Sequence, residues 1–561
     1  MHNYNYFSRL IYLVAFLLTA CSSDSGVDEP PVVNQFTLTV TASLDEGGTV
    51  TPTSAKYSEG KVVSLSAAAS AGYFFKEWTG SVQGTSNPIS VTMDANKTIT
   101  GVFEQLELDA DGDGVRDDLD QCPNTQIGLP VNELGCANPI YLDDNGVTIK
   151  CYDWAEVGDM GEVNGVTYTI VNKDMLLNMI AFDEDMTSVC TTKVTDMKDL
   201  FSQKFQFNQD ISSWDVSNVT TMRTMFYANQ KFNQPLEDWD VGNVTDMASM
   251  FFGAIAFNQD ISRWDVSSVT KMSNMFNGAI NFNQPISNWN VGNITTMTGM
   301  FQSTAFNHPI GNWDVSKITD MTAVFWGSNF NQDISTWDVS NVTRMDLMFY
   351  ESDFNQSLDI WNVSNVTSMV KMFYGSLFNE NIGSWNVSSV VTMLEMFAET
   401  PFNQDIGDWN IANLQGVNGM FRDSNFNKTL ANWEVSNITQ MNEMFKGSMF
   451  NQPLANWNVG NVTQMIGMFE NSVFNQPIGN WDVSKTLNME NMFRNSTFNQ
   501  DISAWDVSNV ENMGYMFANN SLINQNLSAW VVSNVTSCIF FSVNTPQWSL
   551  SKPIFVNCST N

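Results

Sequence analysis

Apolar residues recur along most of the chain with a period of 24 or 25 residues. The stretch FNQDISSWDVSNVTTMRTMF begins at Phe207 and returns with few changes at Phe257, Phe330 and Phe498. Its tryptophan recurs at residues 214, 239, 264, 289, 313, 337, 361, 385, 409, 433, 457, 481, 505 and 530. Such a period is typical of repeat proteins, in which each unit buries its apolar face against its neighbours.

Eight positions of the repeat stay apolar along the array. They are Phe207, Ile211, Trp214, Val216, Val219, Met222, Met225 and Phe226. Trp214 and Val216 are two residues apart, as on one face of a strand. The last four positions fit one face of a short helix, which Ser217 and Asn218 would cap. We therefore expect an α/β repeat solenoid over residues 193–542, with a short parallel strand and a short helix in each repeat, and a C-terminal cap over 543–561.

The pattern differs in the part of the chain before the array. In residues 36–105, the segments FTLTVTAS, KVVSLSAAA, PISVTM and KTITGVF read as strands between glycine, asparagine and proline turns, which predicts a small all-β domain. In residues 138–192, VTIKCYDW and GVTYTIV read as strands and KDMLLNMIAFDEDM has helical spacing. We interpret 138–192 as an N-terminal capping unit for the repeats.

The first residues carry an export pattern. Arg9 precedes the apolar run LIYLVAFLLTA and then Cys21, which is typical of a secretory signal peptide over residues 1–20. The segment LTAC resembles a bacterial lipobox, and this resemblance implies that Cys21 carries lipid, with residues 21–35 as a tether. An ordinary signal peptide with an unrelated cysteine is the alternative. The expected location is the bacterial cell surface, as an outer-membrane lipoprotein.

Cysteine usage agrees with export, because six cysteines remain after Cys21 and an even number suits an oxidising compartment. Sequence alone leaves the pairing open. Short loops close at a lower entropic cost. We therefore favour disulfides Cys122–Cys136, Cys151–Cys190 and Cys538–Cys558.

A net charge of −35 disfavours nucleic acid and anionic membranes as direct partners and favours cations and basic surfaces. The most specific acidic motif is DADGDGVRDDLDQCPNT. Its aspartates and Gly114 occupy the spacing of an EF-hand-like loop, which predicts a calcium site formed by Asp109, Asp111, Asp113, the carbonyl of Val115, Asp117 and Asp120. An acidic linker is the alternative.

Residues 106–137 also resemble a thrombospondin type 3 repeat, on the same aspartates, the CPNT ending and the later GC at Cys136. In that family these aspartates bind calcium, so the resemblance implies calcium as the cofactor. This chain has a single copy, whereas the family usually stacks several.

Two further resemblances concern the larger parts. Residues 36–105 resemble the divergent internalin-type B-repeat domain on GGTVTP, GYFFKEWTG and VTMDANKTITGVF, which implies a small β module of bacterial surface proteins. Residues 193–542 resemble the BspA-like leucine-rich-repeat surface proteins built on FNQDISxWDVSNVTxMxxMF. That resemblance implies a leucine-rich-repeat-like fold, adhesion to host or environmental macromolecules, and no catalysis.

The repeat offers two candidate chemical groups. The aspartate after each tryptophan is often replaced by asparagine, as at Asn290 and Asn362, which keeps an acceptor oxygen but loses basicity. We therefore interpret it, and Asn208 with its equivalents, as hydrogen-bonding turn residues. The tryptophans could bind sugars, but their phase with Val216 favours the core.

The sequence thus favours a non-catalytic adhesion protein that binds an extracellular protein or polysaccharide, contacts no nucleic acid, and meets the membrane only through its lipid. Strand parity would place its binding face at Asp215, Asp238, Asp240, Arg263, Asp265 and Asp408. The alternatives are a calcium-assisted polysaccharide-degrading enzyme on a parallel β scaffold, and a passive surface stalk.

Overall fold

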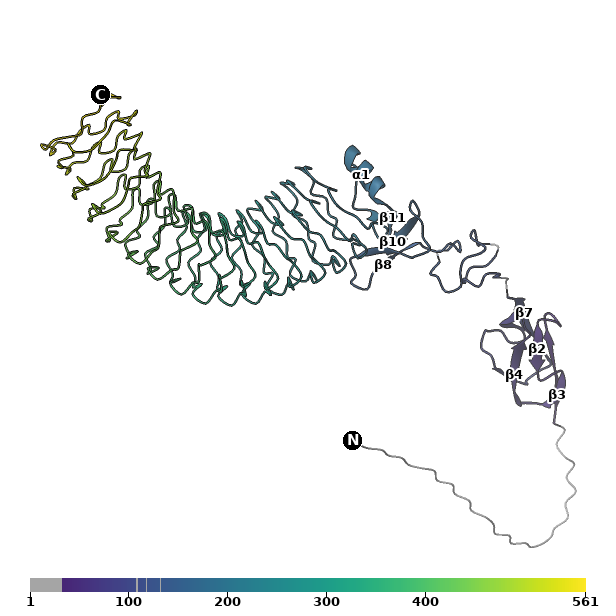
Figure 1. Cartoon of the computed structure of the whole chain (residues 1–561). Helices are drawn as coiled ribbons and strands as arrows, with labels where there is room; N and C mark the ends of the chain where they lie inside the picture. The colour runs from purple at the N-terminus through teal and green to yellow at the C-terminus, as the bar shows by residue number, and fades with distance from the viewer. Residues whose placement is uncertain (1–32, 107–108, 118, 132) are drawn as a thin grey trace, which may run out of the picture. The chain divides into compact units, whose positions relative to one another are not determined.

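The structure, a computed structural model, describes residues 33–561 except 107, 108, 118 and 132. The expected signal peptide and Cys21 lie outside the described residues. The chain divides into two compact units, Met1–Ala137 and Asn138–Asn561 (Figure 1). Among the helices of the described part, none has the length and apolarity needed to cross a bilayer.

The first unit contains a small all-β domain with two sheets. One sheet has the order β3-β1-β7-β5 and comprises β3 (Ala55–Ser58), β1 (Gln35–Ala42), β7 (Lys97–Gln105) and β5 (Tyr73–Gly80). The other has the order β2-β4-β6 and comprises β2 (Gly48–Thr51), β4 (Val62–Ala69) and β6 (Ile89–Thr92). Trp78 is fully buried between them, and its indole N–H donates to the carbonyl of Ser86 at 3.1 Å. Trp78 is therefore a core residue, as expected.

The second unit begins with short elements that precede the array. The strands are β8 (Ile140–Leu142), β9 (Ile149–Cys151), β10 (Met160–Val163), β11 (Val166–Ile170) and β12 (Val189–Cys190), and the helix is α1 (Lys173–Phe182). Asn172 caps α1 by accepting a hydrogen bond from the amide of Met175, and Asp183 ends it in the left-handed conformation. β9 contacts the array directly, because the amide of Ile149 donates to the carbonyl of Ser213 at 2.8 Å. The strands and the helix expected here are confirmed.

Successive repeats of the array stack on one another (Figure 1). Parallel backbone bridges join them, such as Thr221 with Asp246 and Asp320 with Arg344. Alternate amides of each repeat then donate to the next repeat. The amides of Met222, Thr224 and Phe226 donate to the carbonyls of Asp246, Ala248 and Met250 at 2.9, 3.0 and 2.8 Å. The bridges therefore lie just before the first methionine, and not at Trp214–Val216 as the sequence suggested.

The helix expected in each repeat is wrong. Every residue between Asp183 and Asn561 is described, and no helix forms among them. The reason lies in two left-handed residues per repeat, such as Thr224 (φ 56°) and Ala228 (φ 57°), which α-helical hydrogen bonding cannot accommodate. The segment is instead a run of tight turns. The regular structure is thus almost entirely β, and α1 is the single helix of the described residues.

The repeated apolar side chains fill one continuous core. The tryptophans are at most 5% exposed, and the methionines and phenylalanines of the repeat are buried with them. Each indole N–H donates to a carbonyl of the preceding repeat, as Trp239 does to Ile211 at 3.2 Å and Trp337 to Ile310 at 3.0 Å. The expected placement of the tryptophans in the core is confirmed. Each repeat therefore gives the next one both an apolar surface to pack against and a carbonyl that accepts the indole hydrogen bond.

Asparagine side chains form a ladder along the array. Asn208 Oδ1 accepts from the amide of Asn233 at 2.9 Å, and the same bond recurs at each repeat until Asn524 accepts from Ser549. The residue after tryptophan binds its own turn, since Asn290 Oδ1 accepts from the amide of Gly292 at 3.2 Å. The hydrogen-bonding role expected for both positions is confirmed, and for Asn208 it operates between repeats.

Both ends of the array differ from its middle. An additional repeat starts at Phe182, in which Val189 takes the place of tryptophan. Trp214 donates to the carbonyl of Met186 in this repeat at 3.1 Å, as later tryptophans do to an isoleucine or leucine carbonyl of the preceding repeat. At the other end, Phe541 and Trp548 pack over Phe517, and a disulfide joins Cys538 to Cys558. These contacts close the core at its C-terminal end.

Candidate calcium loop and outward faces of the array

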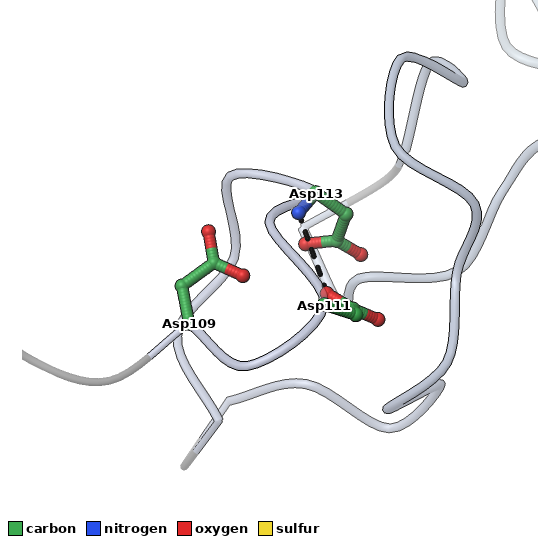
Figure 2. A group of neighbouring side chains, drawn as sticks. All are labelled: Asp109, Asp111 and Asp113. Carbon is green, nitrogen blue, oxygen red and sulfur yellow. Dashed lines mark hydrogen bonds between the residues drawn. The ribbon is translucent and has the colours of Figure 1, made fainter.

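Three of the expected calcium ligands converge in the loop after β7. Each of Asp109, Asp111 and Asp113 offers a carboxylate oxygen, and these oxygens lie within 4.8 Å of one another (Figure 2). Carboxylate oxygens at this spacing form the donor set that a hard divalent cation prefers.

Backbone amides hold this loop in shape. Asp109 accepts from the amides of Gly112 and Gly114 at 2.8 and 2.9 Å. Asp111 accepts from the amide of Asp113 at 3.3 Å (Figure 2). Both glycines have positive φ, 76° and 98°, so the chain turns where other residues would be strained. Asp113 Oδ2 is shielded from solvent and has no hydrogen-bond partner, which is costly for a carboxylate without a cation.

Two other expected ligands, Asp117 and Asp120, do not belong to this group of carboxylates. Asp117 accepts from the amide of Ala110 at 2.7 Å, and Asp120 accepts from the amide of Cys122 at 2.7 Å. The amide of Val115 donates to Asp113 at 2.8 Å. The carboxylates of Asp117 and Asp120 therefore accept hydrogen bonds from the loop's own backbone.

Two of the three expected disulfides are present, Cys122–Cys136 beside the acidic loop and Cys538–Cys558 at the C-terminus. The third is wrong, because Cys151 and Cys190 are free and buried. The Cys190 thiol lies 3.6 Å from the carbonyl of Ile149, and burial raises its pKa to about 12. The thiolate that disulfide exchange requires is thus strongly disfavoured there.

The expected binding face is only partly exposed. Asp240, Arg263, Asp265 and Asp408 are exposed, while Asp238 is half-buried with Oδ1 3.9 Å from Arg263 Nη1. Asp215 is 2% exposed, so its expected outward position is wrong. It lies in the first tryptophan-containing repeat, which β9 covers, and Oδ1 accepts from the amide and hydroxyl of Ser217 at 3.0 and 2.6 Å.

Sequence reasoning missed a second outward face, on the side of the parallel bridges. We call it the turn face and define it by the left-handed residues of the turns and the residue after each MF pair or its equivalent (Val324-Phe325 and Phe540-Phe541). The latter are Tyr227, Phe252, Asn277, Gln302, Trp326, Tyr350, Tyr374, Ala398, Arg422, Lys446, Glu470, Arg494, Ala518 and Ser542. Ala398, Glu470 and Ala518 are buried, and the others are half-buried. Along the array these residues change from aromatic to charged types, and this change in the sequence could have indicated the turn face.

Known families match both units. The profile described as "Mycoplasma protein of unknown function, DUF285" matches residues 166–254, 235–329, 302–401, 351–453, 398–497 and 448–549. The divergent InlB B-repeat domain matches residues 37–107. Comparison with curated proteins gives no match. Because the repeated matches together span well over half of the chain, the protein belongs to the DUF285 family of BspA-like repeats and carries a divergent InlB B-repeat domain before them.

Proposed function

We propose that the protein is a non-catalytic binding protein of the bacterial cell surface, whose repeat solenoid holds an extracellular protein or polysaccharide. One observation carries the proposal. The constant apolar positions of each repeat are buried in the stack, whereas most of the positions that vary are at least partly exposed. The two matched families, both of surface-type repeats, support the same role.

The array's aspartates suit structure better than catalysis. Asp314 Oδ1 accepts from the hydroxyl and amide of Ser316 at 2.6 and 3.1 Å. These hydrogen bonds lower the pKa of Asp314, which makes it a poor general base at neutral pH. The geometry therefore gives less support to a polysaccharide-degrading enzyme than to a binding protein.

The test is a binding screen of the full chain against extracellular matrix proteins and polysaccharides, with product release measured in the same wells. Binding without turnover supports the proposal. Release of oligosaccharides favours the enzyme, and absence of binding to every probe favours the stalk.

We further propose that Asp109, Asp111 and Asp113 hold calcium. The shielded, unpartnered Oδ2 of Asp113 supports a bound cation, as does a donor set made only of oxygens. When bound, the ion would neutralise carboxylates that otherwise repel one another and would stiffen the loop.

Isothermal calorimetry on the full chain tests the site. The combined substitution Asp109→Asn, Asp111→Asn and Asp113→Asn should abolish calcium binding and increase proteolysis near Cys122–Cys136. The matched variant Asp240→Asn, Asp265→Asn and Asp408→Asn removes the same charge elsewhere and should bind calcium as the wild type does. Equal loss in both variants would contradict a defined site.

The proposed anchor is lipid on Cys21, on the pattern LTAC. Cys21→Ser should release the protein from the membrane fraction or stall its processing. A variant that still fractionates with membranes without detergent would exclude lipid as the tether.

A further inference from the structure

We propose that the partner docks on the turn face between Trp326 and Arg494, and that this partner is a polypeptide rich in basic side chains. The inference rests on the binding role proposed above and names its surface and the chemistry of its partner.

On the turn face, the main chain makes regular contacts between repeats. The amides of Met345, Leu347 and Phe349 donate to carbonyls of the next repeat at 3.0, 2.8 and 2.8 Å. On other faces the side chains make such bonds. Asn365, for example, donates to the carbonyl of Ser340 at 2.7 Å. The backbone contacts between repeats therefore do not depend on the side chains of the turn face, and these side chains vary along the array. Some of them also bond between repeats, as Tyr374 does to Glu399.

The first part of this surface is aromatic. Trp326 and Tyr350 lie 5.1 Å apart at 66°, and Tyr350 and Tyr374 lie 4.8 Å apart at 7°. The two tyrosine rings cover each other's faces, so they offer edges and hydroxyls and not the flat platform that stacks on a sugar. Half-buried tryptophan and tyrosine, with arginine beside them, are the residue types enriched in protein–protein interfaces.

The second part is a charged network centred on Arg422. Its guanidinium lies 2.9 Å from Glu395 and 3.4 Å from Glu443, and it donates to the Tyr374 hydroxyl at 3.2 Å. Lys446 continues the network, 2.8 Å from Glu443. The two cationic side chains are mostly buried, since Arg422 and Lys446 are 22% and 26% exposed.

The outermost charges are carboxylates. The side chains of Glu399 and Asp423 are 47% and 51% exposed. Asp423 is crowded, because burial and then the carboxylates of Glu399 and Glu443 raise its pKa against the opposing effects of Arg422 and Lys446. An incoming cation would relieve that repulsion, and on a chain of charge −35 it would also be attracted over a distance. A basic partner is thus the complement of this surface.

The surface is long enough for a specific interface. It spans seven steps between neighbouring repeats, or about 34 Å at the spacing of paired strands. A strip of that length, a few side chains wide, gives roughly 800 Å² per partner, which is the standard size of a stable interface.

The test uses the full chain and an immobilised dodecapeptide of alternating arginine and glycine as the probe. Glu399→Gln with Asp423→Asn should weaken binding roughly tenfold and flatten its dependence on salt. Asp240→Asn with Asp265→Asn removes the same charge from exposed positions outside the turn face and should change binding less than about twofold. Tyr350→Ser, with its thermal melting checked, should weaken binding without any change in charge.

Equal weakening by the two charge variants would overturn the inference, because it would mean unspecific attraction. Binding of a neutral polysaccharide that the turn-face variants abolish, without binding of the arginine peptide, would overturn the partner's chemistry. If the chain binds probes of the wider screen and turn-face variants leave all binding unchanged, this inference fails while the proposed function stands. If no probe of any class binds, the proposed function fails as well.

Discussion

Replacing Trp337 with alanine should destabilise the middle of the array by about 4–6 kcal/mol. The side chain is 3% exposed, lies parallel to Trp361 at 6.5 Å, and approaches Phe325 at 6.2 Å. Truncating a buried tryptophan costs about 3–5 kcal/mol. The carbonyl of Ile310 also loses the indole N–H that donates to it at 3.0 Å, which adds about 1 kcal/mol.

A second variant separates these two contributions. Trp337→Phe keeps most of the apolar surface but removes the indole N–H, so it should cost about 1–3 kcal/mol. Urea denaturation of the full chain measures both variants. Hydrogen exchange then locates the effect, because stability in a repeat array is set mainly by neighbouring repeats. Protection should fall around residues 306–361 and persist near residues 457–505.

An unchanged denaturation midpoint for Trp337→Ala would refute this reasoning. It would mean that the tryptophan column contributes little to stacking. A uniform loss of protection across the array would refute only its local part and would show that the repeats unfold as one unit.

Three other properties of the array can be checked by single measurements. Asn379→Ala removes the oxygen that accepts from the amide of Asn403 at 2.8 Å, so urea denaturation should show a loss of about 1–3 kcal/mol, whereas Asn379→Asp keeps an acceptor and should cost less. Cys538→Ser with Cys558→Ser opens a loop of sequence separation 20 and should lower stability by about 3 kcal/mol, seen as early loss of exchange protection at the C-terminal end. Hydrogen bonds from serines lower the folded-state pKa values of Asp314, Asp338 and Asp482. These hydrogen bonds therefore stabilise the fold fully above the unfolded pKa of about 3.9, and this stabilisation is lost as pH falls through the folded-state pKa values. Thermal melting between pH 5 and pH 2 should show this loss, and the triple asparagine variant should show less of it.

The sequence allowed the period, the core and the interlocking of repeats to be predicted, because these depend on constant positions. Trp214 and Val216 are buried in every copy of the repeat in which they recur, and a constant apolar residue at a fixed period is typical of a core shared by stacked repeats. The small β domain was predictable for a similar reason, since its alternation of buried and exposed residues in β7 is plain.

The conformation within the repeat was not predictable from the same pattern. Met222, Met225 and Phe226 have spacings of three and four residues, which a run of tight turns satisfies as well as a helix does. Left-handed residues distinguish a run of turns from a helix, and here they are Thr224 and Ala228. Neither threonine nor alanine is a residue type that indicates a positive φ. The turn face was missed because strand parity was applied around Trp214, whereas the bridges between repeats lie at Thr221.

The candidate calcium loop was also predictable only in part. The spacing of Asp109, Asp111 and Asp113 was sufficient to bring their carboxylates together, because successive odd positions of one tight loop converge. The roles of Asp117 and Asp120 depend on which backbone amides come near them, and no spacing rule specifies that.

The left-handed residues of the turn face connect stability with binding. Glycine occupies some of these positions, as at Gly375 and Gly419, but Glu351 and Glu395 occupy others with φ of 49° and 51°. A residue with a Cβ costs about 1 kcal/mol or more in this conformation, which glycine would avoid. If stacking were the sole requirement, glycine would serve throughout.

Glu351→Gly tests whether these side chains serve a partner. Glu351 is exposed and its backbone conformation is one that glycine adopts freely, so the variant should gain up to about 1 kcal/mol in urea denaturation. It should also bind the arginine peptide more weakly, since a carboxylate next to Tyr350 is lost. Glu434→Gln is the control, because it removes a carboxylate at the position after tryptophan, outside the turn face, and should leave peptide binding unchanged. A more stable Glu351→Gly protein that binds as tightly as wild type would show that the strain at this position has no connection with a partner.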